Sequence, residues 1–178
     1  MKTALTVTSR NWELKEAFVI SRQTFTRCEV IVVHLECDGH LGRGEGKGVL
    51  YHGETPATLR EQIEAIRGEI AAGAGRRELL DLLPAGGARN AIDAALWDLE
   101  AKRTGVPVWR LAGVEPARPI VSTATIGIRD LDGYEARARS LSSHPWLKIK
   151  VSNDRPLDAI AAVRRGASSA RLVVDANQ

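Results

Sequence analysis

The sequence has few aromatic residues, few cysteines and no long apolar segment. Aromatic residues make up 4% of the 178 residues, and two residues are cysteine. No apolar run approaches the roughly 18 residues that a membrane-spanning helix needs, and the start of the chain lacks the apolar block of a signal peptide. Hydrophobic residues make up 44% and charged residues 26%, which excludes the disordered, collagen-like and disulfide-scaffold classes. We therefore expect a globular protein of the cytoplasm that has no membrane partner.

The two cysteines and the charge balance exclude two further classes. Cys28 and Cys37 lie an odd number of positions apart in one strand-like segment, so side-chain alternation places them on opposite faces and we expect no disulfide between them. The net charge is +3, but 25 basic residues are scattered among 22 acidic ones without a basic run. With so few aromatic residues, this pattern predicts no nucleic-acid partner.

The first part of the chain predicts a meander of strands. Residues 29–37 are mostly β-branched and apolar, Asp38-Gly39 is a strong turn dipeptide, and residues 41–49 are strand-like with four glycines. These features indicate a hairpin whose second strand lies close to other backbone. The Gly-x-Gly repeats precede no helix, so they do not indicate a phosphate site.

Helices are expected after this hairpin. Pro56 suits the first position of a helix, and the apolar residues that follow at helical spacing predict one helix that ends at Gly73. A short helix is expected around residues 77–83. Residues 88–103 then predict a long alanine-rich helix that is packed inside the protein.

From residue 116 onward, strands alternate with helices. Strands are expected at residues 120–128, 146–151 and 172–175, and helices at 131–141 and 156–165. This alternation predicts parallel βαβ units, in which ligands gather at the carboxyl ends of the strands. Three strands do not close a barrel, which normally takes about 250 residues, so we expect the second domain to be incomplete within this sequence.

Two lysines stand at the end of the second of these strands. Lys148 and Lys150 are two positions apart, so their side chains share one face. On the inner face of a barrel they would lie in a partly dry site, where like charge and burial both lower a lysine pKa toward that of a base near neutral pH. An edge strand with two solvated lysines would have the same spacing.

The other two strand ends carry groups that could bind a ligand. Asp175 offers the hard oxygen ligand that Mg²⁺ prefers, and Asn177 could support it from the side. A carboxylate at this position could equally cap a following helix. Thr125 presents a hydroxyl and Gly127 permits close approach to the backbone, although threonine is also common in strands that have no such role.

Five stretches, taken together, resemble a known family. Those similar to the enolase superfamily, and within it to the muconate-lactonising subgroup, are AIDAALWDL at 91–99, LKIK at 147–150 and VDANQ at 174–178. Those similar to the dipeptide epimerases, including the L-Ala-D/L-Glu epimerases, are FVISR at 18–22 and GRGE at 42–45 followed by YHGET at 51–55. The resemblance covers essentially the whole chain.

The resemblance implies a two-domain fold. An α+β capping domain would comprise residues 1–115. The first part of a modified α/β TIM-type barrel would follow in residues 116–178. In this family the loops of the capping domain close on a substrate that is held at the mouth of the barrel.

The resemblance also implies a role for each candidate residue. Lys150 is similar to the base that moves the α-proton, and Lys148 to the neighbouring lysine that contacts the substrate carboxylate. Thr125 is similar to a further substrate contact, and Asp175 to the first Mg²⁺ ligand.

The activity implied is Mg²⁺-dependent epimerisation of a small-molecule dipeptide. Removing an α-proton beside a carboxylate produces an enediolate, and the second negative charge must be stabilised by the metal and Lys148. In the family a second lysine returns the proton on the opposite face. That lysine and the other two acidic ligands come from later strands than this sequence contains. We therefore expect the 178 residues alone to be inactive as an epimerase.

The residue implied at one specificity position departs from the family. Phe25 stands where, in our alignment, the Ala-Glu enzymes have a basic residue. The absence of that basic residue favours a more hydrophobic dipeptide, unless Arg22 or Arg27 supplies the charge.

Two other functions are open. A muconate cycloisomerase or an o-succinylbenzoate synthase of the same superfamily would share Lys148, Lys150 and Asp175. If 178 residues are the whole protein, an inactive remnant or an interaction module is the alternative. A homo-oligomer is open as well, since many TIM-type enzymes associate, although the sequence carries no interface signature.

Overall fold

The computed structural model describes residues 2–20 and 23–176. Its contacts divide the chain into two compact units. The first comprises Met1–Trp12 and Cys28–Ala117, and the second comprises Glu13–Arg27 and Arg118–Gln178. The segment Glu13–Arg27 thus groups by its contacts with the later part of the chain.

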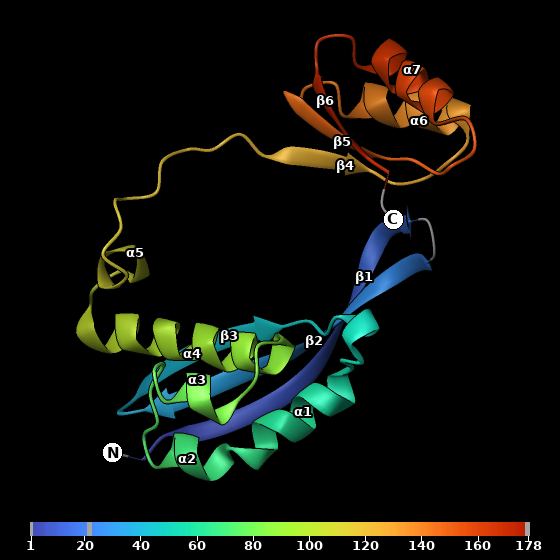
Figure 1. Ribbon diagram of the computed structural model, residues 1–178. Helices are drawn as coiled ribbons and strands as arrows, with labels where there is room; N and C mark the ends of the chain where they lie inside the picture. The colour runs from blue at the N-terminus through green and yellow to red at the C-terminus, as the bar shows by residue number, and fades with distance from the viewer. Residues whose placement is uncertain (1, 21–22, 177–178) are drawn as a thin grey trace. The chain divides into compact units, whose positions relative to one another are not determined.

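The N-terminal sheet has the strand order β1-β2-β3 (Figure 1). Its strands are β1 (Ala4–Ile20), β2 (Gln23–Cys37) and β3 (His40–Gly46). Strands β2 and β3 pair antiparallel, and the predicted turn at Asp38 and Gly39 is confirmed. Both turn residues have positive φ angles, 50° and 75°, as a tight two-residue hairpin turn requires. The length of β1, 17 residues, was not predicted.

The helices of the first unit follow β3 and a short 3₁₀ turn. They are η1 (Leu50–His52), α1 (Pro56–Ala65), α2 (Arg67–Ala71), α3 (Leu79–Leu82), α4 (Gly87–Thr104) and α5 (Val108–Leu111). The single helix predicted from Pro56 to Gly73 is wrong, because the backbone leaves helical geometry at Ile66 (φ −108°, ψ 14°). At this break Arg67 donates a hydrogen bond to the carbonyl oxygen of Leu5. The side chain thereby binds the free edge of β1.

The first core lies between this sheet and its helices. Buried residues alternate along β2, and they pack against the apolar faces of α1 and α4. Cys37 belongs to this buried row, whereas Cys28, which is an odd number of positions away, is only partly buried. Both cysteines are free, as the alternation predicted.

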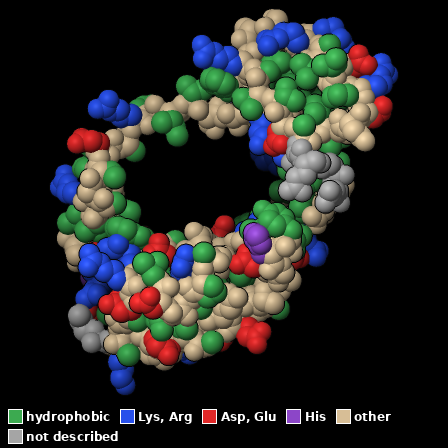
Figure 2. Space-filling view, viewed as in Figure 1, with side chains coloured by type: hydrophobic (Ala, Val, Ile, Leu, Met, Phe, Trp, Pro, Cys, Tyr) green, Lys and Arg blue, Asp and Glu red, His purple; other side chains and the backbone are tan. Residues whose placement is uncertain are grey.

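Strand β3 lies directly against helix α4. A Cβ on Gly44 would collide with the backbone oxygen of Ala91, and Gly42 and Gly46 face α4 in the same way. The predicted close approach of this strand to other backbone is therefore confirmed. Figure 2 shows acidic and basic side chains intermingled on the face of the first unit that it presents.

The second unit contains a parallel sheet of order β4-β5-β6 with two helices on one face (Figure 1). Its elements are β4 (Thr123–Ile126), α6 (Leu131–Ser140), β5 (Trp146–Lys150), α7 (Pro156–Gly166) and β6 (Arg171–Asp175). The predicted βαβ order is confirmed. Buried residues of β4 and β5, together with the partly buried Leu172 of β6, form its core with the facing sides of α6 and α7.

Strand β4 is shorter than predicted. Residue 120 was expected to begin it, but Ile120 is 89% exposed and pairing starts at Thr123. At the other end, the Ile128 N–H donates to the carbonyl oxygen of Val19 rather than to the parallel sheet. No helix in the described part of the chain is both long and apolar enough to cross a bilayer.

Candidate active site

One face of the β4-β5-β6 sheet carries the candidate side chains. Along β5, Leu147 and Ile149 are fully buried in the core beneath α6 and α7. Lys148 and Lys150 alternate with them, so they lie on the opposite face of the sheet. The prediction that the two lysines share a face is confirmed.

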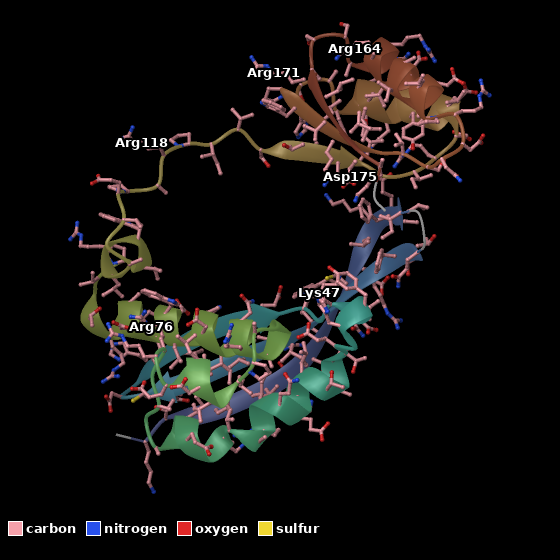
Figure 3. The ribbon with its side chains drawn as sticks, viewed as in Figure 1. Lys47, Arg76, Arg118, Arg164, Arg171 and Asp175 are labelled. Carbon is pink, nitrogen blue, oxygen red and sulfur yellow. The ribbon has the colours of Figure 1, made fainter. Side chains whose placement is uncertain are left out.

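The two lysines meet Asp175 at the end of the neighbouring strand. Lys150 and Asp175 are register partners in the parallel pairing of β5 with β6. The Nζ atoms of Lys148 and Lys150 each lie 2.7 Å from the same carboxylate oxygen, Oδ2 of Asp175. Figure 3 labels Asp175 at the end of β6. The carboxylate offsets the mutual repulsion of the two ammonium groups, and the cluster keeps a net charge of +1.

The three side chains differ in exposure. Lys148 is 37% exposed, Asp175 23% and Lys150 13%. Lys150 is therefore the more enclosed of the two lysines. An amine that is shielded from bulk water is better suited to exchange a proton with a bound molecule than with solvent.

Thr125 lies in the same sheet, in the strand on the other side of β5. It is the register partner of Lys148, and its side chain is partly buried. Because register partners in neighbouring parallel strands point to the same face, its hydroxyl belongs to the face that carries the two lysines. Asn177, which the sequence suggested as a support for Asp175, lies outside the described residues.

The sequence did not reveal a tyrosine that hydrogen-bonds the backbone of this site. The hydroxyl of Tyr134, on α6, donates to the carbonyl oxygen of Lys150 at 2.6 Å. Tyr134 is 3% exposed, and its burial raises the pKa of the phenol, although the Arg129 N–H acts in the opposite direction. The available signal was a tyrosine four positions before the buried Ala138, on the apolar side of an otherwise polar helix.

The predicted specificity residues lie along the first two strands. Phe25, on β2, is partly buried, and Arg27 is exposed. Arg22 falls outside the described residues.

As a metal ligand, Asp175 offers one hard carboxylate donor at a strand end, which suits Mg²⁺. The described residues contain no group of three or more His, Cys, Asp or Glu side chains that could hold a metal ion. The donor set of the described part of the chain thus fits as one ligand of a magnesium site and does not complete such a site.

Comparison with known proteins assigns the chain to a family. Residues 2–113 match the N-terminal domain of the mandelate racemase/muconate lactonizing enzymes. The chain belongs to this family, which is part of the enolase superfamily. Its first unit therefore contains the family's capping fold, and its parallel strands are the start of the barrel.

Several members of the family with known names are similar along nearly the whole chain. The L-Ala-D/L-Glu epimerase of Escherichia coli K12 is 35% identical over 169 residues, which is 94% of this chain and 53% of the relative. An enolase family member from Agrobacterium tumefaciens, solved with sodium and L-Ala-L-Glu bound and with homology to dipeptide epimerases, is 36% identical with a TM-score of 0.93. This match covers 98% of this chain and 54% of that one.

A third relative extends the range of ligands seen in the family. The dipeptide epimerase of Enterococcus faecalis V583, solved with Mg and L-Leu-L-Tyr, is 27% identical with a TM-score of 0.87, and the match covers 100% of this chain and 54% of that one. Two of these three relatives are named epimerases, which are isomerases. The chain spans about half the length of the relatives it matches.

Proposed function

We propose that the protein is a Mg²⁺-dependent dipeptide epimerase that acts by removing the α-proton next to a carboxylate. The observation that carries the proposal is the convergence of Lys148, Lys150 and Asp175 on one face at neighbouring strand ends. Similarity to an L-Ala-D/L-Glu epimerase at 35% identity supports the same reaction class.

In this proposal Lys150 is the base. Its Nζ first releases one ammonium proton to solvent and leaves Asp175 as the neutral amine. The amine then accepts the α-proton, while the electron pair of the broken C–H bond enters the enediolate. The low exposure of its side chain, 13%, limits proton exchange with solvent during this step.

Lys148 has an electrostatic role. Its ammonium group lies on the same face and contacts the same carboxylate oxygen as Lys150. A cation there stabilises the second negative charge that develops on the substrate carboxylate. The hydroxyl of Thr125, in the next strand, is in a position to hydrogen-bond the substrate.

Asp175 would be one ligand of the magnesium ion. When bound, the metal supplies positive charge next to the substrate carboxylate. The proposal assigns the remaining acidic ligands, and the lysine that returns the proton on the opposite face, to the part of the relatives' length that this chain does not span. No step of the present account depends on their geometry.

The proposed substrate class makes a specific prediction about the reacting carbon. In a dipeptide, only the C-terminal residue has its α-carbon attached to a free main-chain carboxylate. Exchange is therefore expected at the C-terminal Cα, and the N-terminal Cα serves as an internal control.

The test is solvent deuterium exchange by the natural protein, produced from its own gene. The protein is incubated with Mg²⁺ in D₂O with a panel that includes L-Ala-L-Glu and L-Leu-L-Tyr, and deuterium at each Cα is followed by NMR. We expect deuterium at the C-terminal Cα of at least one dipeptide, with exchange lost when the metal is chelated.

The alternatives give different results in this assay. A muconate cycloisomerase or o-succinylbenzoate synthase leaves every dipeptide unlabelled but converts its own acidic substrate. A remnant or interaction module leaves all of these compounds unchanged, and either outcome would contradict the epimerase proposal.

A further inference from the structure

The segment Glu13–Arg27 packs in the same compact unit as the parallel sheet. This segment, which we name the arm, contains the end of β1 and the start of β2. We propose that Glu16 is a positioning residue that fastens the arm onto the carboxyl end of β4. This attachment is separate from the chemistry proposed for Lys148, Lys150 and Asp175.

The first observation is an ion-pair cluster around Glu16. Its Oε1 lies 2.6 Å from Nη2 of Arg137 on α6, and its Oε2 lies 3.9 Å from Nη1 of Arg129, which follows β4. Glu16 is 49% exposed, whereas Arg137 is 34% and Arg129 23% exposed. Two basic side chains from different segments therefore converge on one acid of the arm.

Arg137 depends on this acid for compensation. Its Nε atom is buried and, within the part of the chain that the structure describes, has no hydrogen-bond partner. A partly desolvated guanidinium is costly unless an opposite charge lies close by. Glu16 supplies that charge, so the pair links the arm to α6 more strongly than two solvated side chains would.

The second observation is a backbone contact beside the cluster. The Ile128 N–H donates to the Val19 carbonyl oxygen at 3.0 Å. A Cβ on Gly127 would lie 3.1 Å from that oxygen and 3.5 Å from the Phe18 ring, so the glycine leaves room for the arm. Two residues after β4 ends, the backbone N–H of Ile128 thus bonds to the arm and no longer to the parallel sheet.

The contact connects to the candidate site through Arg129. The Arg129 side chain donates from Nε to the Gly127 carbonyl oxygen at 3.2 Å. The backbone N–H of Arg129 donates to the Tyr134 hydroxyl. That hydroxyl in turn holds the carbonyl oxygen of Lys150. Glu16 therefore pairs with a residue, Arg129, that also contacts the Tyr134 hydroxyl. The consequence for substrate binding rests on the proposed function, whereas the docking of the arm does not.

The experiment is amide hydrogen exchange by NMR on the natural protein, with Glu16→Gln and Arg137→Gln as variants. Glu13→Gln is the matched control, because residue 13 is exposed on the opposite face of β1. We expect each variant to accelerate exchange of the Ile128 amide by about two- to fivefold, as the loss of one partly exposed ion pair implies. The amides of β5 and the Glu13→Gln protein should show no change.

Two further readouts separate an ion pair from a general loss of packing. Added salt should accelerate Ile128 exchange in the wild type and have little further effect in Glu16→Gln. The double variant should be no worse than the more affected single variant, because both changes remove one interaction.

The proposal is overturned if Ile128 exchange is unchanged in both variants, if β5 accelerates equally, or if the two effects simply add. No dipeptide enters this experiment, so its failure leaves the epimerase proposal intact. A failed exchange assay with dipeptides would likewise leave the docking of the arm intact.

Discussion

The two sheets of the molecule differ in how their edges and faces are satisfied. In the N-terminal sheet, side chains from the helices bind the free edges. Arg60 and Arg67 donate to the carbonyl oxygens of Val7 and Leu5 on β1. On β3, the Arg43 N–H donates to Asp98, and Lys102 donates to the carbonyl oxygen of Leu41. These contacts block the edges against pairing with another strand.

In the β4-β5-β6 sheet, apolar side chains of the edge strand β6 are exposed. On the edge strand β6, Val173 and Val174 are 39% and 45% exposed. On the face opposite α6 and α7, two lysines share one carboxylate.

The two sheets differ in what their charged side chains bind. Charged groups on a half-buried face are at best a weak source of stability, and apolar residues of similar size often stabilise as well or better. In the first sheet the charged side chains bind backbone groups that need partners. In the second sheet the lysines and Asp175 bind each other at the strand ends, which is where a βα barrel performs its chemistry.

Gly44→Ala is expected to have the largest effect on stability. The new methyl group would collide with the Ala91 carbonyl oxygen, and neither β3 nor α4 can move without disturbing the other. We expect a loss of about 3 kcal/mol in the free energy of unfolding, measured by urea denaturation of the first unit.

Gly68→Ala is the matched control for this glycine substitution. Gly68 lies in α2, and a Cβ there meets no described atom within 4 Å. Alanine should stabilise the helix by about 0.5–1 kcal/mol. Equal destabilisation by the two substitutions would contradict the direct packing of β3 on α4.

Tyr134→Phe should have a smaller effect, confined to the second unit. It removes the hydrogen bond to the Lys150 carbonyl oxygen and leaves the ring in place, for a loss of about 1 kcal/mol. Thermal unfolding followed by residue-specific NMR would show destabilisation of the second unit and not of the first. Tyr51→Phe is the control, because Tyr51 is 87% exposed, and a comparable loss there would contradict the prediction.

The smallest expected effect is a pH dependence of the first sheet. Burial acts to raise the pKa of Asp98, but hydrogen bonds from Lys102 and the Arg43 N–H outweigh it, and the pKa lies below its ordinary value. A carboxyl whose pKa is lowered by folding stabilises the protein above its unfolded pKa of about 3.9, and this contribution is lost as the pH falls.

Because Asp98 is about one-third exposed, the contribution should be below about 1 kcal/mol. The difference in unfolding free energy between pH 7 and pH 3 should shrink in Asp98→Asn. Asp81→Asn, on the exposed side of α3, should leave it unchanged. An unaltered pH dependence in Asp98→Asn would show that Asp98 does not couple β3 to α4.

Much of this arrangement follows from short-range pattern. Side-chain alternation alone places Lys148 and Lys150 on one face, and the alternating strands and helices predict a parallel sheet that brings Asp175 to the neighbouring strand end. The glycines at alternate positions of β3 predict a close approach of other backbone, which in the structure is that of α4. In each case the residues that make the contact recur at a regular spacing along the chain, and the spacing can be read from the sequence.

What the sequence did not reveal depends on contacts between distant segments. The apolar residues of the arm at positions 17–20 are consecutive, so they show no apolar period. The place of the arm is set by Glu16, Val19 and their partners more than 100 positions away. The contacts of Arg76 also join separate segments. Its guanidinium carbon lies 3.3 Å from the centroid of the Trp97 ring, and its side chain pairs with Glu100. Tyr134 contacts Lys150, which lies in another element. The apolar pattern of α6 therefore predicts that Tyr134 is buried but not which group its hydroxyl binds.

The central claim is that Lys150 is the proton-transferring base, and its most direct test is Cα deuterium exchange by the natural protein carrying Lys150→Gln. Lys15→Gln, on an exposed position of β1, is the control. The account predicts that Lys150→Gln slows exchange at the C-terminal Cα of the preferred dipeptide by about 10²- to 10⁴-fold, while Lys15→Gln exchanges at the wild-type rate. Wild-type exchange by a correctly folded Lys150→Gln protein would contradict it.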